Sequence, residues 1–192
     1  MSAQPIKMYS QEEYLELERA ADYKSEYYRG EIFAMSGAGR NHNRINENLS
    51  GEIYLALRNK SCESFSRDLR IHIPENTLYT YPDLIIVCGV PQFLDQHTDT
   101  LLNPTVILEI LSPSTAAYDR VKKFQLYSGI KTLKEYILID SRKLSAEVFR
   151  KGEDGFWELS CEANDITDSI VIATIDLTLQ MSDIYSRTTG II

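Results

Sequence analysis

The stretches Tyr81-Pro82-Asp83-Leu84-Ile85-Ile86-Val87 and Val106-Ile107-Leu108-Glu109-Ile110-Leu111 decide the fold of this chain. Both are short apolar runs, a pattern typical of strands that are covered on both faces of a sheet. One acid interrupts each run, Asp83 in the first and Glu109 in the second. An ionised carboxylate buried without a partner costs several kcal/mol, so the pattern predicts a compensating cation beside these two residues.

The two acids are expected to share one side of the sheet. Side chains alternate along a strand, so Asp83 lies on the face of Ile85, and Glu109 lies on the face of Ile107. Magnesium prefers oxygen ligands and usually takes only one or two protein carboxylates. The sequence therefore predicts that Asp83 and Glu109 together bind Mg²⁺, with Mn²⁺ as the alternative ion.

The region before this core predicts a helix and a hairpin. Tyr9 to Arg19 has a capping-box pattern, with Ser10 as the N-cap and Glu13 three residues later. Ser25 to Met35 fits two short strands that turn at Arg29-Gly30.

The remaining elements alternate between helices and strands. The longest helix is expected from Asn41, as its cap, to about Asn59, and a second from Asp119 to Ser128. Strands are expected at residues 63–73, 81–88, 104–111 and 135–140, in a hairpin of 144–150 with 156–161, and in a last strand with Val171, Ala173, Ile175, Leu177 and Leu179 on one face.

This order predicts an α/β fold: a mixed sheet flanked by helices, with an extra N-terminal hairpin and extra C-terminal strands. We expect one domain over residues 1–192, which is an ordinary length for a single core. Within it, the core spans about 41–140, the N-terminal helix and hairpin 9–35, and the C-terminal strands 144–181.

Composition narrows the class of protein. The chain is 43% apolar and 25% charged, and no apolar run is long enough for a bilayer, which predicts a cytoplasmic protein without membrane contact. The odd number of widely spaced cysteines predicts reduced thiols at Cys62, Cys88 and Cys161. The net charge of −8 argues against a general nucleic-acid coat, but residues 118–134 carry five basic side chains and one acidic side chain, consistent with a local basic surface.

Several motifs in order resemble a nuclease family. Pro82-Asp83 followed by Glu109 resembles the signature of the PD-(D/E)XK nuclease superfamily. More closely, the chain resembles the Uma-two family, described as putative restriction endonucleases, over nearly its whole length. The matching positions are Glu26, Gly30, His42, Pro82-Asp83, Glu109-Ile110-Leu111-Ser112-Pro113-Ser114, Asp119, Lys123, Tyr127, Gly129 and Glu135-Tyr136.

One position departs from the superfamily pattern, which calls for a lysine two residues after the glutamate, where this chain has Leu111. The Uma-two resemblance implies that Lys123, on the following helix, supplies the cation. A helical wheel centred on Val121, Phe124 and Tyr127 places Lys123 on the flank of the core face but Arg120 closer to it, so Arg120 is a rival for this role.

Other candidates have ordinary structural alternatives. His42 could contact substrate or metal-bound water, or be a structural or capping histidine. Glu26 could be a third acid of the metal site, or form a salt bridge in the hairpin. Asp119 and Tyr127 enter through the family pattern as supporting residues, and Lys123 could simply form an i, i+4 ion pair with Asp119.

The resemblance implies a Mg²⁺-dependent endonuclease that hydrolyses phosphodiester bonds in DNA. Because many nucleases that cut both strands place two sites about a two-fold axis, a homodimer is also expected. The alternative is a catalytically inactive nucleic-acid-binding or regulatory module that keeps the nuclease fold. Leu111 and the acidic net charge favour this alternative. A third reading is a structural oligomer that uses the tyrosine-rich hairpin as its interface.

Overall fold

The computed structural model describes residues 7–113 and 116–191. Ser114, one of the positions that resemble the Uma-two family, therefore lies outside the described residues. Among the described residues, every helix is too short or too polar to cross a bilayer.

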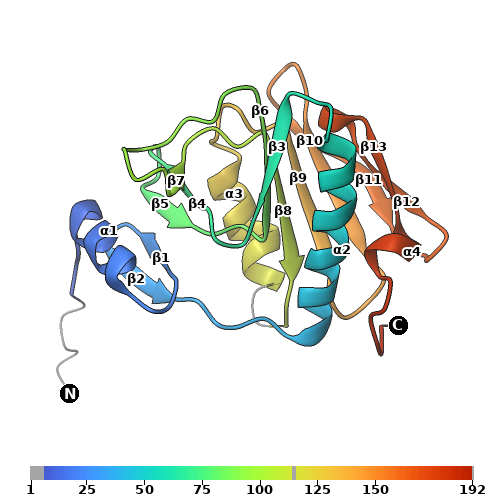
Figure 1. Ribbon diagram of the computed structural model, residues 1–192, viewed down its shortest axis with the longest axis horizontal. Coiled ribbons are helices and arrows are strands. Elements are labelled where there is room, and N and C mark those ends of the chain that lie inside the picture. The colour runs from blue at the N-terminus through green and yellow to red at the C-terminus, as the bar shows by residue number, and fades with distance from the viewer. Residues whose placement is uncertain (1–6, 114–115, 192) are drawn as a thin grey trace.

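A six-stranded mixed sheet contains both acid-bearing runs (Figure 1). Strands β8 and β9 run parallel, and the other neighbours in this sheet are antiparallel. The central strands β6, β8 and β9 are almost completely buried, as their apolar sequences predict. The order is β11 (Trp157–Ala163), β10 (Ala146–Lys151), β9 (Glu135–Asp140), β8 (Val106–Leu111), β6 (Leu84–Cys88) and β3 (Cys62–Ser66).

Helices cover both faces of this sheet. Helix α2 (Arg40–Leu57) buries Ile45, Leu49 and Ile53 against one face, which confirms the long predicted helix, although Gly39 rather than Asn41 occupies the cap position. The other face packs on a π-helix at Tyr118–Lys123 that continues into α3 (Phe124–Tyr127). The second predicted helix is therefore present, but its first part has the wider π geometry.

A second sheet holds the N-terminal hairpin beside the larger sheet (Figure 1). The predicted hairpin, with its turn at Arg29-Gly30, and the Ser10 and Glu13 capping box are both confirmed. Its strands, in order, are β2 (Glu31–Ala34), β1 (Ser25–Tyr28), β5 (Leu78–Thr80), β4 (Arg70–Ile73) and β7 (Thr100–Leu101), and α1 (Gln11–Ala20) packs on the hairpin.

Two predicted strands are wrong because each contains a turn that alternation does not reveal. The predicted strand 63–73 is β3 and β4, which belong to different sheets and are separated at Arg67, where φ is +60°. The predicted last strand is a hairpin of β12 (Ser169–Ile172) and β13 (Leu177–Gln180), joined through a short 3-10 helix at Ala173–Ile175. As a result Val171 is exposed, and Ile170 and Ile172 are buried instead. Helix α4 (Met181–Ile184) follows.

The prediction of three reduced cysteines is also wrong. Cys62 and Cys88 lie directly opposite each other in the β3–β6 pair and form a disulfide, whereas Cys161 is free. Their separation of 26 residues in sequence gave no sign of this, because only the strand pairing brings them together.

A buried polar network fastens α1 to the second sheet. Arg70 is 2% exposed and donates hydrogen bonds to the Tyr81 hydroxyl at 2.9 Å and to the Thr100 hydroxyl at 2.8 Å. The Tyr81 hydroxyl in turn donates to Glu18 of α1 at 2.8 Å. Glu18 also accepts the Ser25 backbone N–H at 2.9 Å. The chain of bonds fixes the start of β1, and hence the hairpin, relative to the strands.

Replacement of Arg70 tests this network. Arg70→Met leaves the buried hydroxyl groups of Tyr81 and Thr100 without the hydrogen bonds of the guanidinium, and we expect the free energy of unfolding to fall by about 3 kcal/mol in urea denaturation. The exposed Arg58 at the end of α2 provides a control, since Arg58→Met should change stability by less than about 0.5 kcal/mol. Equal effects of the two substitutions would contradict a fastening role for Arg70.

Candidate functional site

The predicted site residues gather around a cavity of about 420 Å³. It lies where β6 begins, where β8 approaches its end, and where α2 has its first turn. Glu26, His42, Asp83, Glu109, Asp119 and Lys123 all line it, Tyr127 contacts Glu109 from outside the lining, and Arg120 is absent from it.

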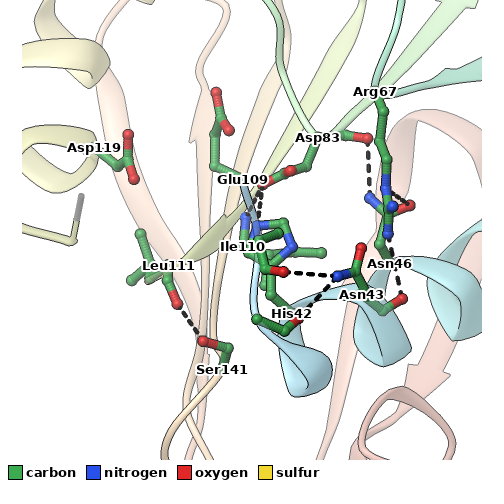
Figure 2. A network of polar contacts seen from close by, with 12 residues as sticks. His42, Asn43, Asn46, Arg67, Asp83, Glu109, Ile110, Leu111, Asp119 and Ser141 are labelled. Carbon is green, nitrogen blue, oxygen red and sulfur yellow. Dashed lines mark hydrogen bonds and ion pairs between the residues drawn. The ribbon is translucent and has the colours of Figure 1, made fainter. Parts of the chain in front are cut away.

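Asp83 directly precedes β6 and is held at the end of that strand. Leu84 pairs with Leu108, so Asp83 lies opposite Glu109 if the same register continues. Its Oδ2 atom accepts the Ile110 backbone N–H at 2.8 Å and lies 3.1 Å from His42 Nε2 (Figure 2). Its Oδ1 atom receives no hydrogen bond from the described residues, which leaves one carboxylate oxygen for a ligand.

Glu109 is 4% exposed and is positioned by two neighbours. Its Oε1 atom accepts the Tyr127 hydroxyl at 2.8 Å and lies 2.9 Å from Lys123 Nζ. Burial raises the pKa of Glu109 to about 8; Lys123 opposes this rise, whereas the charges of Asp83 and Asp119 add to it. Its Oε2 atom receives no hydrogen bond from the described residues.

Lys123 provides the cation of this cluster. Its Nζ atom lies 2.9 Å from Glu109, 3.5 Å from Glu26 and 3.7 Å from Asp119. Burial disfavours the charged lysine, but its neighbours, chiefly Glu109, outweigh this and raise the pKa of Lys123 well above its usual value. The i, i+4 pair with Asp119 is therefore one contact of a larger cluster.

The structure places the two rival cations differently. Arg120 forms an ion pair with Glu147 of β10 and does not reach the cavity, contrary to the helical wheel. The wheel failed because it assumed α-helical spacing and because Val121, its assumed core residue, is 59% exposed. Leu111, where the superfamily pattern has lysine, is fully buried in the apolar core.

Glu26 and His42 line the cavity from different elements. Glu26 belongs to β1 of the second sheet, and its carboxylate accepts a hydrogen bond from the Thr80 hydroxyl. His42 lies in the first turn of α2, and its Nδ1 atom is buried without a partner among the described residues. That unpaired nitrogen leaves His42 able to bind a further group, in addition to contacting Asp83.

Comparison with known proteins shows the family of this chain. A family model named Uma2, with the description "Putative restriction endonuclease", matches residues 11–181. The chain belongs to the Uma2 family.

Two relatives come from Synechocystis sp. (strain PCC 6803), and both are described as uncharacterized proteins. The relative sll1609 is 38% identical over 154 residues, which cover 80% of this chain and 87% of the relative. The relative slr1290 is 35% identical over 182 residues, which cover 94% of this chain and 93% of the relative.

A solved structure has the same fold. It is a crystal structure of a putative nuclease belonging to DUF820 from Anabaena variabilis, with a TM-score of 0.74 and 20% sequence identity. The match covers 91% of this chain and 96% of that chain. At this identity the likeness supports the mixed α/β fold alone.

Two residues of the Uma2 site were not expected from the sequence: Arg67 lines the cavity, and Asn46 contacts Arg67 and Asp83 without lining it. Asn46 is 1% exposed; it donates to the Asp83 carbonyl at 3.0 Å and accepts from Arg67 Nε at 3.1 Å (Figure 2). Asn46 lies one turn after His42 and next to the apolar stripe of α2, and this position could have predicted a buried polar residue near the site. Arg67 had no such signal, because alternation suggested the middle of a strand.

The carboxylate oxygens of the cavity suit a divalent cation that takes only two ligands from the protein and fills its other positions with water and substrate oxygens. Asp83 and Glu109 each have a carboxylate oxygen with no hydrogen-bond donor in the described part of the chain, and both line the same cavity. No three His, Cys, Asp or Glu side chains among the described residues form a closed ligand set. This is the pattern expected for Mg²⁺, which is commonly bound through one or two carboxylates and completed by water and substrate oxygens.

The pKa of Glu109 predicts a pH dependence of stability. A carboxyl whose folded pKa lies above its unfolded value loses stabilisation as pH rises from the unfolded pKa to the folded one, here from about 4.5 to about 8. In EDTA, we expect wild-type stability to fall relative to Glu109→Gln by up to about 1.4 kcal/mol per pH unit between pH 5 and pH 8. Urea denaturation at several pH values measures this, and a pH-independent difference would show that Glu109 is ionised throughout.

Proposed function

We propose that this protein is a metal-dependent endonuclease that hydrolyses phosphodiester bonds in DNA, with Mg²⁺ as its cofactor and Mn²⁺ as the alternative. We further propose that its larger sheet is a restriction-endonuclease-like core. The observation that carries this proposal is Lys123 Nζ at 2.9 Å from Glu109, in the cavity that Asp83 also lines. Asp83, Glu109 and Lys123 line one cavity, which supports reading them as the acid, acid and cation of the superfamily motif although Leu111 replaces the motif lysine.

The residues of the chain divide the work of the reaction. Asp83 and Glu109 would hold the cation, which when bound lowers the pKa of water and polarises a phosphate oxygen. The Ile110 N–H orients Asp83, and the Tyr127 hydroxyl orients Glu109. Lys123 donates to a non-bridging oxygen of the phosphate, where negative charge increases in the transition state.

The atoms of this hydrolysis balance with water as the only co-reactant. The water oxygen forms a new bond to phosphorus, and the bond from phosphorus to the leaving sugar oxygen breaks. The water loses one proton to solvent, and the leaving oxygen takes one from solvent. His42, beside Asp83, keeps that carboxylate oriented during the exchange.

Cleavage assays test the catalytic set directly. We expect the protein to cut plasmid DNA with Mg²⁺, and Asp83→Asn or Glu109→Gln to abolish cutting. Lys123→Met should lower the rate by about 10²- to 10³-fold, the loss typical of removing one donor aimed at transition-state charge. Circular dichroism and melting temperature check that each variant is folded.

Arg120→Met is the matched control for the lysine, because Arg120 lies on the same helix but pairs with Glu147. Its cleavage rate should stay near that of the wild type. Equal losses in Lys123→Met and Arg120→Met would contradict the assignment of Lys123. Salt-dependent DNA binding without turnover in either Mg²⁺ or Mn²⁺ would instead support the inactive nuclease-fold module.

Metal binding can be measured without catalysis. An ion at about 100 times its dissociation constant adds about 2.7 kcal/mol to stability, which raises the melting temperature of a chain of this size by roughly 5 to 10 °C. We expect this shift with Mg²⁺ in the wild type and in Glu63→Gln, whose exposed acid lies on β3. The double variant Asp83→Asn with Glu109→Gln should lose it, and an undiminished shift there would place the ion elsewhere.

A further inference from the structure

The connection between β3 and β4 holds an arginine in a backbone conformation that non-glycine residues rarely adopt. Arg67 has φ of +60°, in the left-handed region, where its Cβ is crowded by the backbone. Both of its backbone groups are nevertheless held: its N–H donates to the Asp83 carbonyl at 3.1 Å, and its carbonyl accepts from Lys24 Nζ at 2.8 Å. Such over-determined strain is typical of functional positions, since a turn alone would be better served by glycine.

The guanidinium of Arg67 is fixed in place without being neutralised. Its Nε donates to the Asn46 side-chain oxygen at 3.1 Å, and its Nη2 donates to the Asn43 carbonyl at 3.4 Å (Figure 2). Both acceptors are uncharged, and Arg67 forms no ion pair with any described residue. Nη1 has no hydrogen-bond acceptor among the described residues, so charge and donor capacity remain for a ligand.

Arg67 differs in this respect from the other cations that line the cavity. Lys123 contacts several acids, and Lys24 pairs with Asp68 at 3.0 Å. Of these three lining cations, Arg67 alone lacks an acidic partner within the described part of the chain. A cavity that neutralises its other cations but keeps one arginine unpaired is suited to an anion at that arginine.

Asn46 connects this arginine to Asp83. Its side-chain NH2 group donates to the Asp83 carbonyl, and its side-chain oxygen accepts from Arg67 Nε. Because Asn46 is buried on α2, Arg67 and Asp83 are held by the same side chain. An anion bound by Arg67 would therefore lie at a defined place beside Asp83.

We infer that Arg67 binds a phosphodiester group of the nucleic-acid substrate and positions the strand beside Asp83, with Asn46 as its positioning residue. This inference rests on the proposed nuclease function and names a substrate-binding residue for the same cavity. The planar fork of arginine matches two phosphate oxygens at once, which lysine cannot do.

The salt dependence of DNA binding tests this inference. Fluorescence anisotropy of a labelled duplex oligonucleotide is measured with Mg²⁺ between 50 and 200 mM NaCl, in the Glu109→Gln background so that the strand stays intact. Adding Arg67→Gly should lower the affinity about tenfold and reduce the slope of log affinity against log salt by about 0.9, the value for one lost phosphate contact.

Glycine is chosen because it accepts the left-handed backbone, so the variant loses the side chain while the turn is relieved of strain. We expect its melting temperature to stay close to that of the background protein, because relief of the left-handed backbone offsets the hydrogen bonds lost at Asn46 and Asn43. Arg67→Lys should retain the slope because it keeps the charge, but should bind more weakly because it loses the fork. Arg58→Gln, at the exposed end of α2, is the matched control and should change neither affinity nor slope.

The slope of log affinity against log salt decides whether Arg67 binds a phosphate. An unchanged slope in Arg67→Gly, or no DNA binding by the background protein, would overturn the inference and make Arg67 a structural clamp of the turn. Failure of the proposed function has a different signature, because it shows as cleavage that survives Glu109→Gln, or as absent wild-type cleavage despite binding. A reduced slope supports the role of Arg67 in either of those cases.

Discussion

The contact between Lys123 and Glu109 is the interaction on which the rest of the site depends. Both side chains are almost fully buried, and each would be costly to bury alone. Glu26 and Asp119 also approach Lys123, so the acids outnumber the nearby lysine and leave the cluster with excess negative charge. Burial, followed by the charges of Asp83 and Asp119, raises the pKa of Glu109, and a divalent cation would offset the negative charge of the cluster.

The N-terminal hairpin brings a further acid, Glu26, to this cluster. Glu26 comes from the second sheet, and its place near Lys123 depends on how β1 is held. The register pair of Tyr27 with Tyr79 joins the hairpin to β5, and the Arg70 network anchors the preceding helix. The second sheet therefore does more than extend the fold, because it supplies one wall of the cavity.

Much of the fold was accessible from the sequence, and the reasons are local. The apolar runs around Asp83 and Glu109 predicted central strands, the stripe of Ile45, Leu49 and Ile53 predicted α2, and Arg29-Gly30 predicted the hairpin turn. These signals arise within a few residues of one another. The disulfide of Cys62 with Cys88 and the break at Arg67 depend on which strands pair, and periodicity carries no information about pairing.

The sequence indicated which residues line the cavity better than it indicated how they are arranged. Asp83 and Glu109 were found because an acid within an apolar run is conspicuous, and their roles remain predictions.

The α-helical wheel placed Lys123 on the flank of the core face, where it does reach the cavity, but it misplaced Arg120, which pairs with Glu147 instead. A π-helix widens the turn, and in this chain the widened turn runs from Tyr118 to Lys123 and ends with the lysine buried. With Leu111 committed to the apolar core, the strand itself has no basic side chain to offer at that position. The π-helix then provides a physical route by which a lysine on the next element reaches the acid that the strand presents.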